Sequence, residues 1–397
     1  MAESAVRPPR HAVARLSAHY VLLFGVTGVS LPYAALWMRD RGLSGAEIGV
    51  ILAVPMLARL ITGPLLAVWA DGFRRRRSPI AILGLTAALG YGGAIWVEGF
   101  GLWMACWFVG ATAAAALIPL SDVLALRVAR RGGFAFALPR GFGSAAFVAA
   151  NVGMGVLLVQ LPEVAIGVWI AVGSALTALF AALGLPGEPV GEAGPTRARD
   201  RFRGLGALLG SPAFVAAVLA TSALHASHAF YYAFSAVIWT AQGLSAGTIG
   251  ALWGFSVVAE IGFMWLVEPW RRRLRIDPWT LVALAGLAGV VRWAVMATSP
   301  DLVWLVPLQA LHALSFAAAY LAGLELIDRS SPPEAHTAAQ TLSSALSSGV
   351  VIGLATLVSG PLYDAHGAAG YLAMTVLAAA GGVLALVMRR QVSWRET

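Results

Sequence analysis

Lysine is absent from this sequence of 397 residues, and all 27 of its basic side chains are arginine. Schiff-base chemistry, which needs a lysine amine, is therefore excluded. The single cysteine, Cys106, has no partner for an internal disulfide, and a metal site built from thiolates is disfavoured. Charged residues make up only 12% of the chain, whereas soluble proteins contain about 25%. The chain is too poor in charge to present a water-exposed surface of ordinary composition.

Several functional motifs are also missing from the sequence. It has no Gly-Lys-Ser/Thr loop to hold a nucleotide and no His-Glu-x-x-His zinc motif. These absences argue against an ATP-driven pump that acts without a partner, and against an intramembrane enzyme. We expect no catalytic residues, no metal and no organic cofactor.

What the sequence does contain is apolar residues, which make up 59% of it, with a mean hydropathy of +0.78. A membrane helix needs roughly 20 apolar residues, and about 30 with its connection, so about twelve spans fit. The runs cover 13–37, 46–70, 79–97, 101–124, 134–161, 164–185, 212–239, 246–267, 278–297, 302–327, 338–362 and 370–388. They predict an all-α membrane protein that leaves no room for a large soluble domain.

Arginines alternate between the two sides of the predicted spans. One side collects the N-terminal tail, the clusters at 74–77, 127–131, 197–203 and 271–275, Arg329 and the C-terminal tail, while the other holds only Arg39 and Arg41. Positive loops stay in the cytoplasm, so an even number of spans and two cytoplasmic termini are predicted. The net charge of +8 is thus attributed to the loops of an inner-membrane protein and not to nucleic-acid binding.

The polar stretch 186–211 divides the chain into a predicted N-terminal bundle, 1–185, and a C-terminal bundle, 212–397. The two halves repeat with an offset of 201 residues, which places Gly42-Leu43-Ser44 on Gly243-Leu244-Ser245. Ile48-Gly49 then matches Ile249-Gly250, and Arg59 matches Glu260. Repeats of this kind are the plan of many secondary transporters.

Four charged residues lie well inside predicted spans: Arg59, Arg140, Glu260 and Arg292, with His312 as a fifth polar group. A charge there costs about 2.5–3.5 kcal/mol, so it is paired, hydrated or functional. We hypothesise that Glu260 is a proton or substrate site, with Arg292 on the next helix as its charge partner; a static buried ion pair that fixes helix packing is the alternative. The surplus of positive charge suits an anionic substrate such as a carboxylate.

Polar and aromatic stripes follow helical spacing on four spans. Such stripes line a substrate cavity or contact another helix, and both interpretations stay open. Aromatic rings beside polar groups suit an aromatic or ring-shaped substrate. The candidates are Tyr20, Phe24, Thr27, Arg140, Ser144, Asn151, His225, His228, Tyr232, Gln309, His312, Phe316 and Tyr320.

The stretch from Ala67 to Arg77, which contains Asp71 and a cluster of four arginines, resembles the loop motif of the major facilitator superfamily. Ala67 and Arg74 stand where that motif has glycines. Other segments resemble the phenylpropionate-permease-like branch, which is akin to lactose permease and nucleoside–proton symporters. They are Arg41–Gly49, Ala58-Arg59, Arg140–Ser144, Phe230–Phe234, Trp253, Val258–Ile261, Arg292-Trp293, Gln309–Ala313 and Gly360–Asp364.

The resemblance implies the major facilitator fold: twelve transmembrane helices in two six-helix bundles related by pseudo-two-fold symmetry. It also implies a monomeric secondary transporter that works by alternating access, with protons as coupling ion. Asp71, Arg74, Arg75 and Arg76 would form a cytoplasmic gate. Ser315 stands where lactose permease carries its proton-binding Glu, so that role cannot be transferred. Open alternatives are an uncoupled facilitator, a sugar or nucleoside symporter, and a transporter-like sensor.

Overall fold

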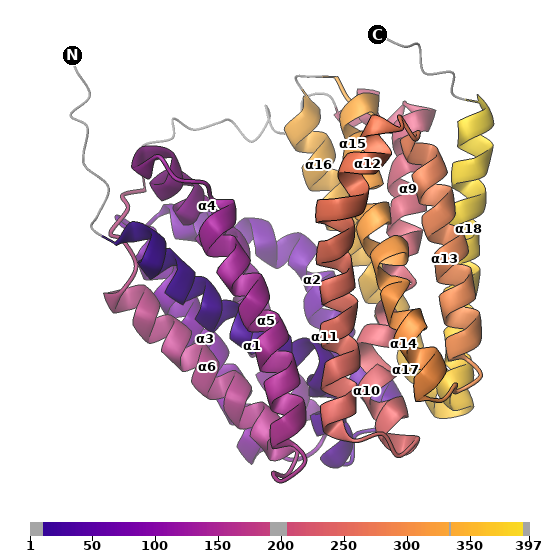
Figure 1. Cartoon of the computed structure of the whole chain (residues 1–397). Helices are drawn as coiled ribbons and strands as arrows, with labels where there is room; N and C mark the ends of the chain where they lie inside the picture. The colour runs from indigo at the N-terminus through magenta and orange to yellow at the C-terminus, as the bar shows by residue number, and fades with distance from the viewer. Residues whose placement is uncertain (1–10, 191–204, 333–334, 392–397) are drawn as a thin grey trace, which may run out of the picture. The chain divides into compact units, whose positions relative to one another are not determined.

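The computed structural model describes residues 11–190, 205–332 and 335–391 (Figure 1), and within these ranges the regular structure is helical apart from one isolated bridge between Arg75 and Pro189. The first half contains α1 (Ala12–Asp40), α2 (Gly45–Asp71), α3 (Arg77–Trp96), α4 (Phe100–Gly132), α5 (Ala137–Leu157) and α6 (Val164–Leu183). The second half begins with α8 (Leu205–Leu209), α9 (Pro212–Ala226), α10 (Ala229–Ala241), α11 (Ala246–Gly262), η1 (Phe263–Val267) and α12 (Glu268–Arg273). It continues with α13 (Pro278–Met296), α14 (Leu302–Ala310), η2 (Ala313–Ala318), α15 (Ala319–Ser330), α16 (His336–Ala345), η4 (Leu346–Val351), α17 (Ile352–His366), η5 (Gly367–Gly370) and α18 (Tyr371–Gln391).

Ten helical stretches within the described residues are long and apolar enough to cross a membrane. One of them, Ala338–Gln391, has 54 residues and includes both α17 and α18, which the short 3-10 turn η5 separates. The 21-residue helix α5 is not among the ten. Counting the long stretch as two and adding α5 gives twelve, in agreement with the twelve spans predicted from the apolar runs.

The described residues form two compact units. Unit 1 comprises residues 11–43, 58–190 and 245–250, and unit 2 comprises residues 44–57, 205–244 and 251–391 without 333–334. Unit 2 therefore includes the first part of α2, from the first half of the chain. Unit 1 includes the first part of α11, from the second half. The division at 186–211 stays a prediction, because residues 191–204 lie outside the described part of the chain.

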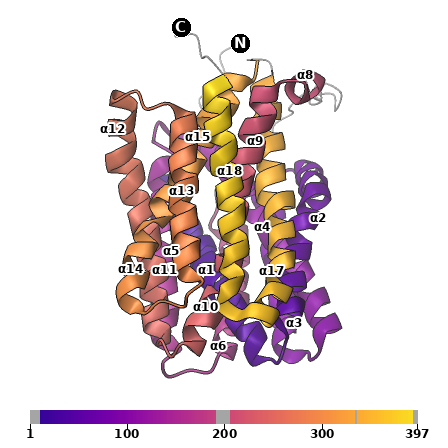
Figure 2. The same cartoon turned by 90° about the vertical axis from the view of Figure 1, so that its right-hand side faces the viewer.

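Within unit 1, α1 packs against α5 and α6, and α3 packs against α4 and α6. Large buried rings join these helices, for example Trp37 and Trp103, whose centroids lie 4.5 Å apart. Within unit 2, α18 lies beside α9 and α13 (Figure 2). There Gly286 of α13 and Gly382 of α18 let the two backbones meet, because neither carries a side chain at the crossing.

The repeated Gly-Leu-Ser segments form the same local structure twice. Gly42 and Gly243 have φ of +82° and +84°, a conformation that glycine adopts without strain, and each ends the preceding helix. The serine that follows then caps the next helix: the amides of Glu47 and Thr248 both donate to a serine hydroxyl at 3.2 Å. The sequence repeat is therefore also a structural repeat.

Among the described residues, the interrupted and π-helical segments lie in unit 2. The apolar run 212–239, predicted as one span, is interrupted between α9 and α10, where Ser227 and His228 separate two helical segments. Three π-helical segments, η1, η2 and η4, also lie in unit 2, and unit 1 has none among its described residues. Such π segments change which residues share a face and are frequent at functional sites.

Candidate functional site

Arg292 on α13 is the central charge of unit 2, and its side chain is fully buried. Its Nη1 donates to Nδ1 of His312 at 2.9 Å and to Oγ of Ser315 at 3.4 Å, and its Nη2 donates to Oε1 of Gln309 at 3.0 Å. All three acceptors are neutral, and no described carboxylate forms an ion pair with this guanidinium. Arg292 is thus a buried cation that hydrogen bonds hold in place without a direct counter-charge.

Glu260 on α11 reaches Arg292 only through an imidazole. Its Oε2 lies 3.7 Å from Nε2 of His312, whose other ring nitrogen accepts from Arg292. The direct Glu260–Arg292 pair expected from the sequence is therefore wrong in detail, because His312 stands between the two charges. An arginine can only donate, so Nδ1 of His312 must be unprotonated and its proton must be on Nε2, facing the carboxylate.

Aromatic rings enclose the guanidinium of Arg292. Its central carbon lies 4.6 Å from the ring centroid of Tyr231 and 4.4 Å from that of Trp293, distances at which a cation is attracted to the ring faces. Tyr231 also stacks on Trp253 at 4.6 Å and donates its hydroxyl to Gln309 at 3.0 Å. The rings keep Arg292 in one orientation and replace part of the hydration that it loses on burial.

The irregular helices of unit 2 position this cluster. His228 lies at the interruption between α9 and α10, where its Nδ1 contacts the carbonyl oxygen of Leu224 at 3.0 Å and its Nε2 contacts Oγ of Ser315 at 3.2 Å. The π segment η2 begins immediately after His312 and carries Ser315 and Phe316. Phe316 stacks on His312 with centroids 5.1 Å apart and planes 7° apart. The seventh and tenth spans thus meet at His312.

Unit 1 holds a second polar cluster, made by α1, α4 and α5. Tyr20 donates its hydroxyl to Oδ1 of Asp122 at 2.6 Å, and the same carboxylate oxygen lies 3.5 Å from Nε of Arg140. The guanidinium carbon of Arg140 lies over the Phe24 ring at 4.2 Å. The side chain of Arg140 remains 31% exposed.

These geometries fit the relationships of the chain to known proteins. The model of a family described as "MFS_1 like family" matches residues 13–373, which is most of the chain. This chain belongs to the MFS_1 like family.

Individual relatives of this MFS_1 like protein agree in length. It is 28% identical to the probable 3-phenylpropionic acid transporter of Escherichia coli (strain K12), over 92% of this chain and 95% of the relative. It is 27% identical to the maltose permease of Geobacillus stearothermophilus, over 87% and 86% of the two chains. The crystal structure of nucleoside transporter NupG superposes on this chain with a TM-score of 0.82 at 18% sequence identity. The superposition covers 97% of this chain and 100% of NupG. The predicted major facilitator fold is confirmed, and the chain is a secondary transporter of that type.

The MFS_1 like protein brings together most of the polar stripe predicted on its tenth span. Gln309, His312 and Phe316 belong to the Arg292 cluster, and Tyr232 lies beside His228 with ring centroids 5.8 Å apart. His225 lies in the last turn of α9. Its ring is edge-on to those of Phe316 and Tyr320, with centroids 5.3 and 6.3 Å apart. Tyr320 is 44% exposed and marks the outer end of this row of rings.

Other predicted residues lie apart from the two clusters or contact only their own helix. Thr27 donates to the carbonyl of Leu23 one turn earlier in α1. Asn151 is buried on α5 beside the start of α11, and Ser144 is half-buried on α5. Arg59 is exposed on the unit 1 part of α2, and no described carboxylate forms an ion pair with it. Their assignment to a cavity or to coupling stays a prediction.

The predicted gate motif is held largely by the start of the linker. Asp71 pairs with Arg76 at 3.6 Å. The backbone around Arg74 and Arg75 instead binds the segment after α6: Val190 donates to the carbonyl of Arg74 at 3.3 Å, and Arg76 donates its amide to the carbonyl of Glu188 at 2.9 Å. The four residues are close together, and their gating role stays a prediction.

Five residues of the two clusters were missing from the predicted site: Asp122, Tyr231, Trp253, Trp293 and Ser315. Tyr231 lies three residues after His228, a spacing that also shares its helix face, and its ring contacts the guanidinium of Arg292. Ser315 was visible in the sequence only as a substitution for an acidic residue, and its role depends on the π segment η2.

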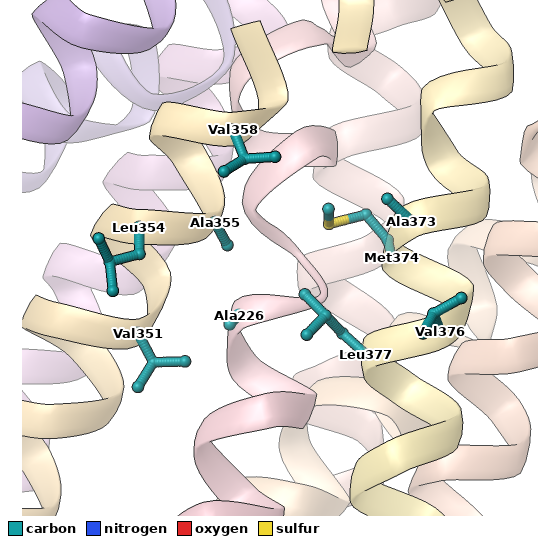
Figure 3. Close-up of a pocket in the computed structure, with 9 residues that line it drawn as sticks. All are labelled: Ala226, Val351, Leu354, Ala355, Val358, Ala373, Met374, Val376 and Leu377. Carbon is teal, nitrogen blue, oxygen red and sulfur yellow. The ribbon is translucent and has the colours of Figure 1, made fainter. Parts of the chain in front are cut away.

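A separate cavity of about 470 Å³ lies between α9, α17 and α18 of unit 2 (Figure 3). Its lining residues are Ala226, Val351, Leu354, Ala355, Val358, Ala373, Met374, Val376 and Leu377. None of these side chains forms hydrogen bonds of the kind that orient a polar solute. In the described part of the chain, no three His, Cys, Asp or Glu side chains are grouped as metal ligands.

Proposed function

We propose that this chain is a proton-coupled symporter of a small organic anion, with an aromatic carboxylate as its substrate class. It would work by alternating access, as a monomer in the cytoplasmic membrane, with both termini in the cytoplasm. The observation that carries the proposal is the chain of contacts from Arg292 through His312 to Glu260 in unit 2.

Glu260 is the proton-exchanging group in this proposal. Arg292 donates to Nδ1 of His312, so a second proton on that imidazole would bring two N–H groups against each other. As long as the Arg292–His312 bond exists, an incoming proton is therefore taken up by the carboxylate. The side chain of Glu260 is 21% exposed, which leaves access for a proton, whereas His312 and Arg292 are buried.

Arg140 is the substrate-binding group in the proposal. Its guanidinium is the partly exposed cation of the unit 1 cluster, and planar carboxylates match the fork of arginine nitrogens. Phe24 and Tyr20, whose centroids lie 4.2 and 5.6 Å from the guanidinium, supply an aromatic surface beside it. The similarity to a probable 3-phenylpropionic acid transporter of Escherichia coli supports the same class.

The coupling half of the proposal is tested with Glu260→Gln in proteoliposomes. Glutamine imitates the protonated acid and cannot release a proton, so we expect uphill uptake of 3-phenylpropionate driven by a pH gradient to be lost. Exchange of labelled for unlabelled substrate across the membrane should continue. The matched control is Glu98→Gln, which removes an exposed loop carboxylate between α3 and α4. Uphill uptake by Glu260→Gln at the wild-type level would contradict the assignment.

The substrate half is tested by ligand-induced thermal stabilisation of the purified protein, since a ligand that binds only the native state raises its melting temperature. The panel is 3-phenylpropionate, its uncharged amide, maltose and a nucleoside. We expect only the carboxylate to stabilise the wild type, and Arg140→Gln to abolish that effect. Stabilisation by maltose or the nucleoside alone would instead favour a sugar or nucleoside symporter.

A further inference from the structure

The first turn of α2 is capped from a distant part of the chain. Ser44 and Glu47 form a local capping box, in which the amide of Glu47 donates to the serine hydroxyl and the amide of Ser44 donates to the glutamate at 2.8 Å. The amides of Gly45 and Ala46 instead donate to the two carboxylate oxygens of Asp364 on α17, at 2.8 and 2.7 Å. One carboxylate thus binds two free amides at the positive end of the helix.

Close packing of α2 on α17 makes this contact possible. A Cβ atom at Gly49 would lie 3.0 Å from Cα of Gly360, and one at Gly45 would lie 2.6 Å from Oδ1 of Asp364. The end of α17 is itself anchored, because the ring of Tyr363 stacks on that of Phe234 with centroids 4.6 Å apart and planes 6° apart. Asp364 is therefore presented to α2 by a fixed support.

The structural repeat provides a comparison without such a cap. Gly250 of α11, which matches Gly49, packs on α5, and a Cβ atom there would lie 2.9 Å from the carbonyl oxygen of Asn151. Ser245 caps that helix locally, and no described carboxylate accepts from the amides of Ala246 or Gly247. Glycine packing and a serine cap are common to both crossings, so the carboxylate is an addition that close packing alone does not require.

The position of α2 determines what this addition does. The helix is continuous, but its first part, 44–57, belongs to unit 2 and its remainder to unit 1. Any movement of its first turns away from α17 must break both hydrogen bonds to Asp364. We propose that Asp364 is a latch that holds the α2–α17 crossing closed and sets how often it opens during transport. The latch deepens the proposed function and rests on it.

The test measures opening of the crossing directly, through a reporter cysteine at Ala53, a fully buried residue of α2. In a Cys106→Ser background, we follow its alkylation by N-ethylmaleimide in purified protein in lipid nanodiscs. Two charge-assisted hydrogen bonds are lost in Asp364→Ala, and we expect the labelling rate to rise about tenfold or more. The labelling rate of Asp364→Asn should rise similarly, because the amide nitrogen of the asparagine would face backbone donors. The labelling rate of Asp364→Glu should stay nearer that of the wild type.

Two controls separate a latch from a general structural support. Asp301→Asn removes a carboxylate at the start of α14 whose side chain caps nothing, and it should leave labelling unchanged. A second reporter at Ala317, buried in η2, should also label at its wild-type rate in Asp364→Ala. An unchanged rate at residue 53, or an equal rise at both reporters, would overturn the proposal. Labelling needs no substrate, so its outcome is independent of the uptake experiments that test transport.

Discussion

We expect replacement of Arg271 by alanine to destabilise the protein far more than replacement of Arg329, although both arginines bind Glu325. The side chain of Arg271 is 5% exposed, and it donates to both oxygens of Glu268 at 2.8 Å, to Glu325 at 2.7 Å and to the carbonyl of Ile276 at 2.9 Å. Arg329 pairs with Glu325 one helical turn away, and its side chain is 44% exposed.

The difference in burial determines the magnitude. Removing one partner of a buried ion pair costs about 3–5 kcal/mol, because the other charge is left without compensation. Glu268 would keep Arg272 at 2.8 Å, and Glu325 would keep Arg329, so we expect the lower end, about 3 kcal/mol, for Arg271→Ala. An exposed pair contributes about 0–1 kcal/mol, which is the expectation for Arg329→Ala.

The assay is thermal unfolding of the purified variants in one detergent, with Arg271→Lys as a third variant. Lysine keeps the charge but not the planar fork that binds both oxygens of Glu268, so its melting temperature should lie between those of wild type and Arg271→Ala. A loss of about 3 kcal/mol should lower the melting temperature of Arg271→Ala by about 5 °C or more. Equal melting temperatures for Arg271→Ala and Arg329→Ala would refute the argument from burial.

Two further predictions concern the cluster of Tyr20, Asp122 and Arg140 in unit 1 and the crossing of α13 with α18 in unit 2. Tyr20→Phe removes the hydroxyl that donates to Asp122 at 2.6 Å, so the carboxylate should pair more strongly with Arg140 and compete with an anionic substrate. We expect the KM for 3-phenylpropionate to rise about tenfold, the effect of about 1.4 kcal/mol, in initial-rate uptake. Gly286→Leu should cost about 3 kcal/mol or more, because even its Cβ would lie 2.6 Å from Cα of Gly382; thermal unfolding measures this loss.

Each of these two predictions has a matched control. Tyr33→Phe removes another buried hydroxyl of α1, which donates at 3.2 Å to the carbonyl of Asn151, and should leave the KM unchanged. Gly262→Ala adds a Cβ where nothing lies within 4 Å, and should not lower the melting temperature. A KM in Tyr20→Phe equal to that of the wild type, or equal melting temperatures for the two glycine variants, would contradict the reasoning.

The sequence was sufficient for the properties that depend on one helix at a time. Apolar runs of bilayer length predicted the spans, because each helix must satisfy its own backbone hydrogen bonds in lipid. Gly42-Leu43-Ser44, which the sequence repeats at residue 243, forms the same helix end and cap at both places, because helix ends and caps are determined by neighbouring residues. Charges at Arg140, Glu260 and Arg292 were recognisable as exceptional because burying them is costly.

Tertiary structure decided which of these groups meet. The direct pairing of Glu260 with Arg292 could not be corrected from the sequence, because the position of His312 between them depends on where the tenth span approaches the ninth. The contact of Tyr231 with Arg292 joins the seventh and ninth spans, so spacing along one helix could not predict it. Asp364 binds Gly45 across 319 residues of sequence, and only the packing of α2 on α17 places a carboxylate at that helix end.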